Sequence, residues 1–472
     1  MNRRQILVQV VLFLTCVLFF SSCGRIGDST LATFDGGDVQ TDEYIEYFLS
    51  STKYKKDVMP DEENLKHIVA LKAMEKMAVL EAIEQGIEND SLYIESVENN
   101  LRKTLFFRYM RREIIDTVIN DSLIQVFYDN FSPQYHMSYI MRPVVSSSTP
   151  DFEKSQKDTI DYVYKLLQAG SDFKDIAARY SQDITSNQKG GSLGFVIRES
   201  MGDAALRAAM DTLKDLTWST PIRGFEGYYI LYKGERRDVA IPPIEEIRDK
   251  IWQTLYRTRK HDIRRELDKR FKYLAMKYKF NEEEEQIAEI IKKSGGSKGT
   301  SLLAELNFDA LKDEDMGRAI ATYEGGEVKL YELFEEKNRK PSNRLEFNER
   351  FETICHRHLL AKHAMELGYE NEPDIKEKMT DVKESLLRSF LYKRNVIDIA
   401  DARLAAIEEQ ERLSGVQENP DEFRRVTLQR SVKEDLEAEI KQKYNFKFVT
   451  NNFKSALKRA EKKKIEQNSQ SN

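Results

Sequence analysis

The chain has 472 residues, of which 33% are charged and 40% are hydrophobic, and its net charge is −6. This length allows two or three domains, and charges of both signs interspersed along the chain are typical of a soluble, helix-rich protein. No basic stripe is interleaved with aromatic residues, so the composition argues against a nucleic-acid partner.

The first residues have the three parts of an export signal. Arg3 and Arg4 precede an apolar run over residues 6–20, and small residues follow it up to Cys23. The apolar run is shorter than the ~20 residues that a transmembrane helix needs. The segment resembles a bacterial lipoprotein signal, although Phe20 stands where leucine is usual. The resemblance implies removal of residues 1–22 and acylation of Cys23, which would anchor the protein to a membrane. An ordinary cleaved signal with an incidental Cys23 is the alternative.

The three cysteines agree with an exported protein that is held by its cores alone. Cys16 leaves with the signal and Cys23 carries the lipid, so Cys355 is the one thiol left in the mature chain. No intramolecular disulfide can then form. We expect a location on the periplasmic side of a bacterial membrane. By family analogy the outer membrane is favoured, because Gly24 is not the acidic residue that often retains lipoproteins on an inner membrane.

An internal repeat organises most of the chain. Residues 32–39 (ATFDGGDV) recur as residues 321–328 (ATYEGGEV), and residues 82–116 align without gaps to residues 364–398. Gly86 and Gly368 stand at matching positions, where the end of a helix needs a left-handed residue. Each copy is expected to be one helical folding unit.

The region between the copies follows a different pattern. Residues 135–141 alternate like a strand, residues 151–169 form an amphipathic helix, and Ser171 is the expected N-cap of a second helix. A glycine-rich turn at residues 190–194 leads into a strand. A helix over 201–213 and a strand over 228–232 complete the order strand, helix, helix, strand, helix, strand.

Three motifs in this region are specific. DFKDIAARYSQD at 172–183, GGSLG at 190–194 and GYYIL at 227–231 resemble, in order and spacing, a parvulin-type peptidyl-prolyl isomerase domain. Such a domain within a helical body is similar to the SurA and PrsA kinds of exported chaperone. The resemblance implies an α+β fold: a mainly helical chaperone body, built from the duplicated module, with an inserted small antiparallel sheet surrounded by helices. It also implies unfolded or nascent exported proteins, including outer-membrane proteins, as partners.

The family's site residues are only partly present. Parvulins have two histidines in a hydrogen-bonded group beneath the peptide, and these positions hold Tyr139 and Tyr229. Asp183 keeps the acidic position, and Glu226 stands in a loop where serine or threonine is frequent. His136 cannot replace the first histidine, because strand residues alternate faces and it points away from the face of Tyr139.

The proline slot is expected to be apolar. Leu193, Met201 and Met210 match its positions, whereas an aromatic residue expected near Ala205 is missing. The same three residues are equally well interpreted as plain core. The loss of both histidines leaves isomerase activity open.

We expect no cofactor and no metal. His356, His358 and His363 lie on one predicted helix, but only the spacing of seven places two of them on one face.

The predicted organisation follows from the repeat, the resemblance and the Gly/Ser-rich stretch after residue 291. The domains are a signal (1–22), a first helical module (23–133), a parvulin-like domain (134–238), a return helix that completes the first module (239–291), a linker (292–300), a second helical module (301–398), and C-terminal helices with a polar tail (399–472). In the second copy, residues 421–443 are the expected return helix, with Leu436 and Ile440 parallel to Leu267 and Phe271.

Three functions remain open from the sequence. A holdase chaperone would suppress aggregation even without residues 134–237. An active isomerase would accelerate proline-limited refolding through Asp183 and Met201. A non-enzymatic scaffold lipoprotein would co-purify with an envelope partner and leave unfolded chains unaffected.

Overall fold

The computed structural model describes residues 28–51, 58–145, 148–297, 301–335, 339–414 and 422–470; the predicted signal and Cys23 lie outside them. Over these described residues helices predominate and three small antiparallel sheets accompany them, which confirms the predicted fold class. The chain divides into two compact units, the described parts of Met1–Asn100 with Lys376–Asn472 (unit 1) and Leu101–Ile375 (unit 2). Within the described ranges, no helix combines the length and the apolar character needed to cross a membrane.

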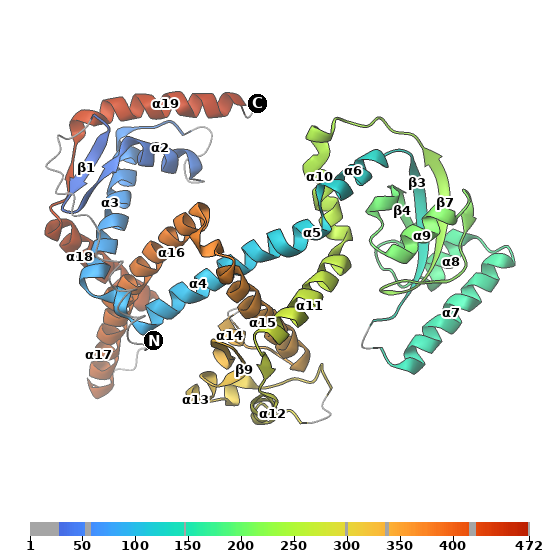
Figure 1. Cartoon of the computed structure of the whole chain (residues 1–472). Helices are drawn as coiled ribbons and strands as arrows, with labels where there is room; N and C mark the ends of the chain where they lie inside the picture. Colours follow the sequence, from blue (N-terminus) through green and yellow to red (C-terminus); the bar gives the residue numbers. More distant parts are fainter. Residues whose placement is uncertain are drawn as a thin grey trace. The chain divides into compact units, whose positions relative to one another are not determined.

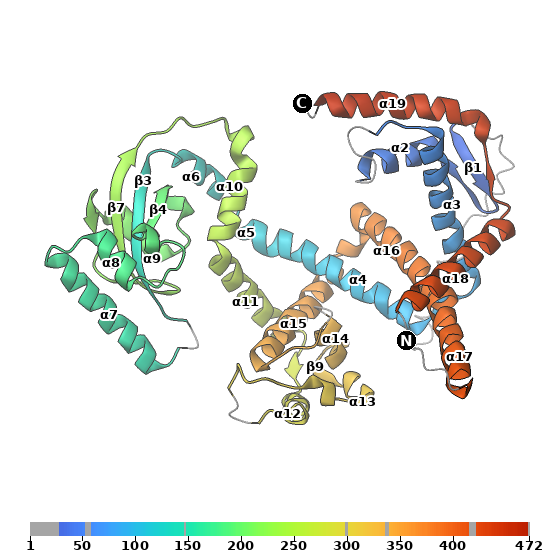
Figure 2. The same ribbon diagram turned by 180° about the vertical axis from the view of Figure 1, so that it is seen from behind.

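Unit 1 combines the beginning of the chain with its end (Figures 1 and 2). Its N-terminal elements are β1 (Thr30–Phe34), β2 (Gly37–Gln40), α2 (Thr41–Ser50), α3 (Glu62–Glu84) and the start of α4 (Ser91–Tyr109). Its C-terminal elements are most of α16 (Pro373–Tyr392), α17 (Asp398–Ser414), α18 (Glu422–Lys443), β11 (Lys447–Phe448) and α19 (Phe453–Gln470). The turn between β1 and β2 contains Gly36 at φ +97°, a value that favours glycine.

The hairpin of the first copy is closed by a strand from the far end of the chain. β11 pairs antiparallel with β1, with Phe448 opposite Ala32. The N–H of Asp35 donates to the carbonyl of Tyr444 (2.7 Å). Ile440 and Tyr444 lie in the same hydrophobic cluster as the side chains of β1, α2 and α3.

Unit 2 repeats this arrangement around the hairpin of the second copy, β9 (Ala319–Tyr323) and β10 (Gly326–Lys329). The closing strand is β8 (Asn281–Glu282), which pairs with β9. The N–H of Glu324 donates to the carbonyl of Tyr278 (2.7 Å), the counterpart of the bond from Asp35. Lys279 and Asn445, which follow the two tyrosines, share the rare φ of +52°.

The two copies therefore exchange their C-terminal arms. The first return segment was expected to complete its own module, but α11 (Lys260–Lys277) packs against α15 (Arg344–Glu366), and β8 pairs with the second copy's hairpin. Likewise α18 packs against α3, and β11 pairs with the first copy's hairpin. The shared geometry matches Ile440 with Leu274, so the predicted match of Ile440 with Phe271 was wrong by three residues.

The inserted domain is a five-stranded sheet with helices on both faces. Its elements are β3 (Gln134–Pro143), α7 (Pro150–Gln168), α8 (Phe173–Tyr180), β4 (Ser192–Val196), α9 (Ala204–Thr212), β5 (Thr217–Trp218), β6 (Ile222–Arg223) and β7 (Gly227–Arg237). The strand order is β4-β3-β7-β5, and β6 also pairs with β7. α7 and α8 pack on one face around Ile140 and Ile230, and α9 packs on the other face around Met137 and Leu231 (Figure 2).

Several predicted boundaries differ from the structure. Asp172, not Ser171, caps α8, because its carboxylate accepts from the N–H groups of Lys174 and Asp175. Met201 precedes α9 instead of opening it, and the short strands β5 and β6 were missed.

The remaining helices of unit 2 also refine the prediction. They are α5 (Asp116–Val118), α6 (Asp121–Asp129), α10 (Ile244–Thr258), α12 (Glu284–Lys293), α13 (Asp313–Met316) and α14 (Leu330–Glu335). The return helix expected within residues 239–291 is broken at Arg259 into α10 and α11. The predicted linker is packed over its described part, since Ser294 is buried and Gly296 lies against Ile291 and Leu306. Residues 298–300 lie outside the described residues.

The exchange predicts that the two halves hold together without a covalent link. We expect that a protease site inserted after Ser297, once cleaved, leaves both halves co-eluting in native size-exclusion chromatography. The physical reason is that each hairpin and core is completed by the other half. Ile440→Asp, which places a charge among buried apolar side chains, should loosen the cleaved complex. Separation of the cleaved halves in native buffer would contradict the exchange.

Candidate functional site

Two tyrosines lie side by side on the central strands of the inserted sheet. Tyr139 on β3 is opposite Leu231 on β7, so Tyr229 is its diagonal neighbour on the same face. Their rings meet edge to face, with centroids 5.6 Å apart at 82°. His136 lies on the other side of β3 and contacts Ser192 and Phe195 instead, as strand alternation predicted.

Asp183 is the acceptor of this site. It follows α8, and its carboxylate accepts hydrogen bonds from the hydroxyls of Tyr139 (2.9 Å), Thr185 (2.9 Å) and Ser186 (2.5 Å). Sequence reasoning found Asp183 and Tyr139 but missed Thr185 and Ser186. A carboxylate followed two and three residues later by hydroxyl side chains was the signal that could have found them.

The electrostatics keep the tyrosines neutral and Asp183 charged. Burial, followed by the negative charge of Asp183, raises the pKa of Tyr139 well above its ordinary value. Burial, followed by the charges of Glu226 and Asp203, raises the pKa of Tyr229 in the same way. Burial raises the pKa of Asp183, but the hydrogen bonds from Ser186, Thr185 and Tyr139 outweigh this effect and lower it overall. Both phenols are therefore hydrogen-bond donors at every physiological pH.

The residues predicted for the proline slot gather at the same face. Met201, Met210 and Tyr229 belong to one hydrophobic cluster, against which Leu193 and Tyr139 pack. Met201 is 5% exposed and Met210 is 4% exposed, so their side chains are in core packing here. Leu206 on α9, next to Ala205, is buried in the same cluster, but it is not the aromatic residue expected there. An open slot would need these flexible side chains to move.

Glu226 does not join the hydrogen-bonded group. Its side chain is exposed and reaches His261 on α11, with 3.6 Å between carboxylate oxygen and Nε2. The ring of His261 also lies against that of Phe225, with centroids 3.5 Å apart and the ring planes tilted by 37°. Glu226 therefore takes part in a contact between the inserted domain and the helical part of unit 2.

A buried ion pair secures this contact. Arg259, at the junction of α10 and α11, pairs with Glu199 over 3.0 Å, and both side chains are 4% exposed. Arg259 also donates to the carbonyl of Met201 (3.2 Å), so it holds the loop that carries a predicted slot residue. The sequence contained a signal for Arg259: it continues the buried stripe of Ile247, Ile251 and Leu255 at a spacing of four, where an apolar residue is expected.

One group of side chains among the described residues has the spacing of a metal site. It consists of Asp268, Glu352 and His356. Arg264 already forms ion pairs with both carboxylates and supplies the positive charge there. His358, another of the histidines considered above, instead bonds Tyr323 and Glu332.

Comparisons with known proteins identify the inserted domain. Residues 138–235 match the family model described as Rotamase, PPIC-type PPIASE domain. The chain therefore carries a parvulin-type peptidyl-prolyl isomerase domain, as the three motifs predicted.

The relatives extend this similarity beyond the domain. Foldase protein PrsA 2 of Bacillus cereus is 24% identical over 267 residues, covering 54% of this chain and 85% of the relative. A putative peptidyl-prolyl cis-trans isomerase, Cbf2 of Campylobacter jejuni, is 23% identical over 216 residues, covering 44% of this chain and 77% of the relative. The chain thus has relatives among parvulin-type foldases and isomerases.

Solved structures with weaker overall agreement are also similar. A PrsA structure from Bacillus anthracis is 20% identical, with a TM-score of 0.26, covering 43% of this chain and 96% of that one. A chain from the PEB4 and Cj1289 pair of SurA-like chaperones of Campylobacter jejuni is 22% identical, with a TM-score of 0.21, covering 53% of this chain and 98% of that one.

The acceptor role of Asp183 predicts a pH-dependent loss of stability in Asp183→Asn. Because the folded-state pKa is lowered, the charged form stabilises the fold fully above its ordinary pKa of ~3.9, and this contribution disappears as the pH falls through the lowered value. We expect the variant to lose about 1–3 kcal/mol at pH 7 and to approach the stability of the parent as the pH falls through the lowered pKa of Asp183.

The measurement is urea unfolding followed by Trp218 fluorescence in a Trp252→Phe background, since the chain has two tryptophans. The exposed Asp158→Asn is the matched control and should change nothing. A loss for Asp183→Asn that is as large at pH 3 as at pH 7 would refute the charged acceptor.

The buried pair predicts that Arg259→Met detaches the inserted domain. Removing Arg259 leaves Glu199 buried with Arg198 as its remaining partner, so we expect a loss near the lower end of ~3–5 kcal/mol. Limited proteolysis should then cut first near the junction of α10 and α11. The double variant Arg259→Met with Glu199→Gln should lose less, and the exposed Arg257→Met should behave like the parent. Equal proteolysis of Arg259→Met and Arg257→Met would show that the Arg259–Glu199 pair does not fix the inserted domain to α10 and α11.

Proposed function

We propose that this protein is a cell-envelope folding factor that binds unfolded exported proteins, with a parvulin-type domain that retains at most slow isomerase activity. The observation that carries the proposal is the gathering of Tyr139, Tyr229 and Met201 on one face of that domain, with Asp183 at its edge. The foldase relatives support the same class of function.

The chemistry of prolyl isomerisation sets what the site must do. Rotation about an X–Pro bond faces a barrier of ~18–20 kcal/mol, and a catalyst lowers it by holding the ring and stabilising the twisted amide. In this site the hydroxyl of Tyr139 already donates to Asp183. Tyr229 is the second donor and is the one we assign to the amide of a bound proline. Met201, Met210 and Leu193 are assigned to the ring.

Two features favour binding over fast catalysis. Met201 and Met210 are buried, so the slot has to open before a proline ring enters. Glu226, in the loop beside the last strand, is turned toward His261 and away from the hydrogen-bonded group. The fully active isomerase is the second candidate, favoured by the intact group of Asp183 with its hydroxyl donors.

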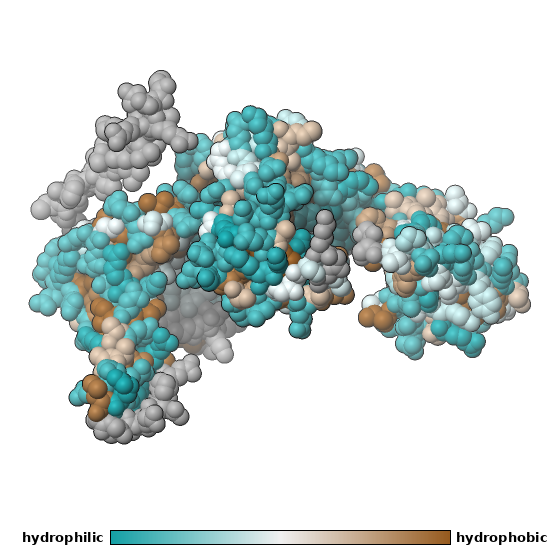
Figure 3. Space-filling view, turned by 90° about the horizontal axis from the view of Figure 1, so that it is seen from below, coloured by the Kyte–Doolittle hydropathy of each residue, from teal (hydrophilic) through white to brown (hydrophobic). Residues whose placement is uncertain are grey.

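The helical parts offer dispersed apolar contact for unfolded chains. Large apolar side chains of the helices are exposed, among them Met276 (76%) and Phe107 (63%) in unit 2. Figure 3 shows apolar residues scattered among polar ones over the visible face. Adaptable methionine and aromatic contacts suit clients of many sequences.

The proposal includes a location outside the cytoplasm, on a bacterial membrane. The signal-like residues 1–22 support export, and Cys23 supports a lipid anchor on the periplasmic side, with the outer membrane favoured. Unfolded outer-membrane or secreted proteins are the proposed clients. One related structure is of a pair that includes a protein named as periplasmic.

One refolding experiment separates holding from isomerisation. Gln134 pairs with Arg237, so the two ends of the inserted domain are adjacent and a short glycine bridge can replace residues 134–237. We expect the deletion variant to keep most of the suppression of client aggregation. The full chain should speed a proline-limited refolding step at most several-fold, and Tyr229→Phe should remove that effect.

The outcomes discriminate the candidates. A large acceleration that Tyr229→Phe and Asp183→Asn abolish would establish the active isomerase. Loss of aggregation suppression in the deletion variant would place client binding in the inserted domain. No effect of the full chain on either readout would refute a folding factor and favour a scaffold.

A further inference from the structure

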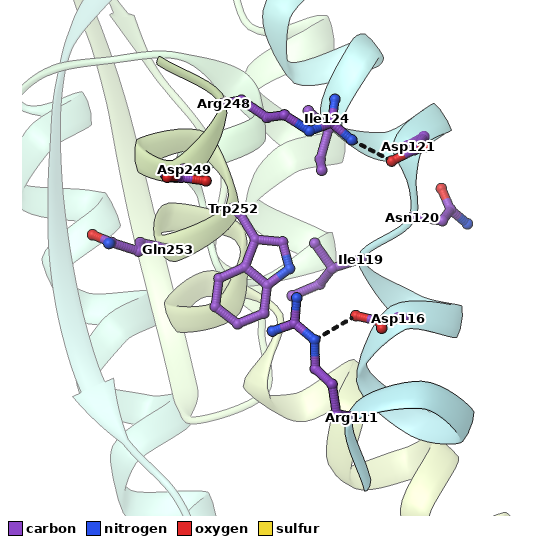
Figure 4. A pocket seen from close by; sticks show the side chains of 10 residues that line it. All are labelled: Arg111, Asp116, Ile119, Asn120, Asp121, Ile124, Arg248, Asp249, Trp252 and Gln253. Atoms are coloured by element: carbon purple, nitrogen blue, oxygen red, sulfur yellow. Dashed lines mark hydrogen bonds and ion pairs between the residues drawn. The ribbon is translucent and has the colours of Figure 1, made fainter. Parts of the chain in front are cut away.

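The base of the inserted domain contains a pocket that the site described above does not use. It lies between α5–α6, which lead into the domain, and α10, which leads out of it (Figure 4). Its volume is about 610 Å³, within the ~300–1,000 Å³ of ligand pockets. It is lined by Arg111, Asp116, Ile119, Asn120, Asp121, Ile124, Arg248, Asp249, Trp252 and Gln253.

The floor of the pocket is apolar and contains an unused hydrogen-bond donor. Ile119 and Ile124 are buried, and the indole of Trp252 lies between them and α10 (Figure 4). The Nε1–H of Trp252 is buried and has no acceptor among the described residues. Buried donors are nearly always satisfied, so this indole nitrogen points to an acceptor that arrives with a ligand.

A movable side chain covers that donor. The guanidinium of Arg111 lies 4.2 Å from the centre of the indole ring and pairs with Asp116 over 2.9 Å. Figure 4 shows it on the side of the indole that carries the nitrogen. Arg111 and Asp116 are about half exposed, so the guanidinium can swing toward solvent and uncover Nε1–H at little cost.

The rim excludes a polyanion and favours a polypeptide. Its two cations face three carboxylates, and each cation already pairs with one of them, Arg111 with Asp116 and Arg248 with Asp121. No positive charge is left over for a phosphate. The exposed rim also leaves the mouth open, which suits a segment of a longer chain whose two ends must leave the pocket.

We propose that this pocket binds an extended segment of an unfolded polypeptide through one aromatic or large aliphatic side chain. The side chain packs against Ile119, Ile124 and the indole. The adjoining peptide carbonyl accepts from Nε1–H of Trp252, after Arg111 has moved aside. This inference rests on the proposed chaperone function and assigns a particular client site to the two helices that carry the parvulin-type domain.

Trp252 can report on its own pocket. In the full chain with Trp218→Phe it is the one tryptophan left, because the sequence contains two. The probe is a short synthetic peptide without tryptophan or tyrosine, with a central phenylalanine among glycine, serine, aspartate and lysine. The matched probe has serine in place of the phenylalanine. We expect a saturable change in Trp252 emission with the first peptide and none with the second.

Variants then locate the binding. Ile119→Asp should weaken binding of the labelled peptide, measured by anisotropy, by about tenfold or more. Gln253→Phe, an exposed substitution that fills the mouth without touching the core, should weaken it similarly and guards against misfolding of the first variant. Leu303→Asp, which adds a charge at an exposed apolar position in a turn outside the helices, is the matched control and should bind normally.

Either of two results would contradict the proposal that this pocket binds a polypeptide segment. Unchanged Trp252 emission, or equal peptide affinity of Gln253→Phe and Leu303→Asp, refutes peptide binding at this pocket. If aggregation suppression persists in that case, the proposed function stands and its client site lies elsewhere. If suppression is absent as well, the proposed function fails with it.

Discussion

The pairing of each hairpin with a strand from the other copy is the interaction on which both units depend. A two-stranded hairpin is marginal by itself, so β1–β2 and β9–β10 need a third strand and a helical cover. β11 and β8 supply these strands, and the residues that precede them, around Tyr444 and Tyr278, enter the opposite copy with the same backbone hydrogen bonds. Neither copy is therefore a complete folding unit, and duplication has made the two copies mutually dependent. The inserted domain stands in the first copy alone, directly before the arm that this copy donates.

Because of this placement, the segment formed by α10 and α11 takes part, from its beginning to its end, in three different contacts. Trp252 on α10 forms the floor of the pocket, Arg259 at the junction holds the loop of Met201, and α11 continues into β8. All three lie within unit 2. Ion pairs buried as deeply as Arg259–Glu199 add little stability over apolar contact, but they fix one geometry because a misplaced partner leaves a buried charge. The break in the helix at Arg259 is therefore the feature that sets the orientation of the parvulin-type domain on its helical support.

The features that could be predicted from the sequence are those that residues close together in the chain determine. The glycine-rich turn at residues 190–194, the left-handed Gly86 and Gly368 and the alternation of β3 depend on neighbouring residues, and the structure agrees with each. The exchange of arms was beyond sequence reasoning, because equivalent edges in two copies accept equivalent strands and periodicity does not say which copy donates. The break of the return helix at Arg259 was not predicted for a related reason: the partner of Arg259, Glu199, is sixty residues away in the chain. At the site, strand alternation correctly kept His136 apart from Tyr139, whereas the turn of Glu226 toward His261 required knowing that α11 lies there.

The replacement of two histidines by Tyr139 and Tyr229 changes the physical character of the site more than its shape. A histidine titrates near neutral pH and can donate or accept with either ring nitrogen. A buried phenol whose pKa is raised stays neutral and offers one donor, and in Tyr139 that donor is committed to Asp183. The group beneath the peptide is thus fixed in one protonation state, with Asp183 negative and both tyrosines protonated. In the proposed function such a group orients a bound proline through Tyr229, but it cannot redistribute protons as the amide twists. This fixed protonation state, together with methionines that are buried in core packing, is the physical basis for proposing that the domain holds proline-containing segments and isomerises them slowly.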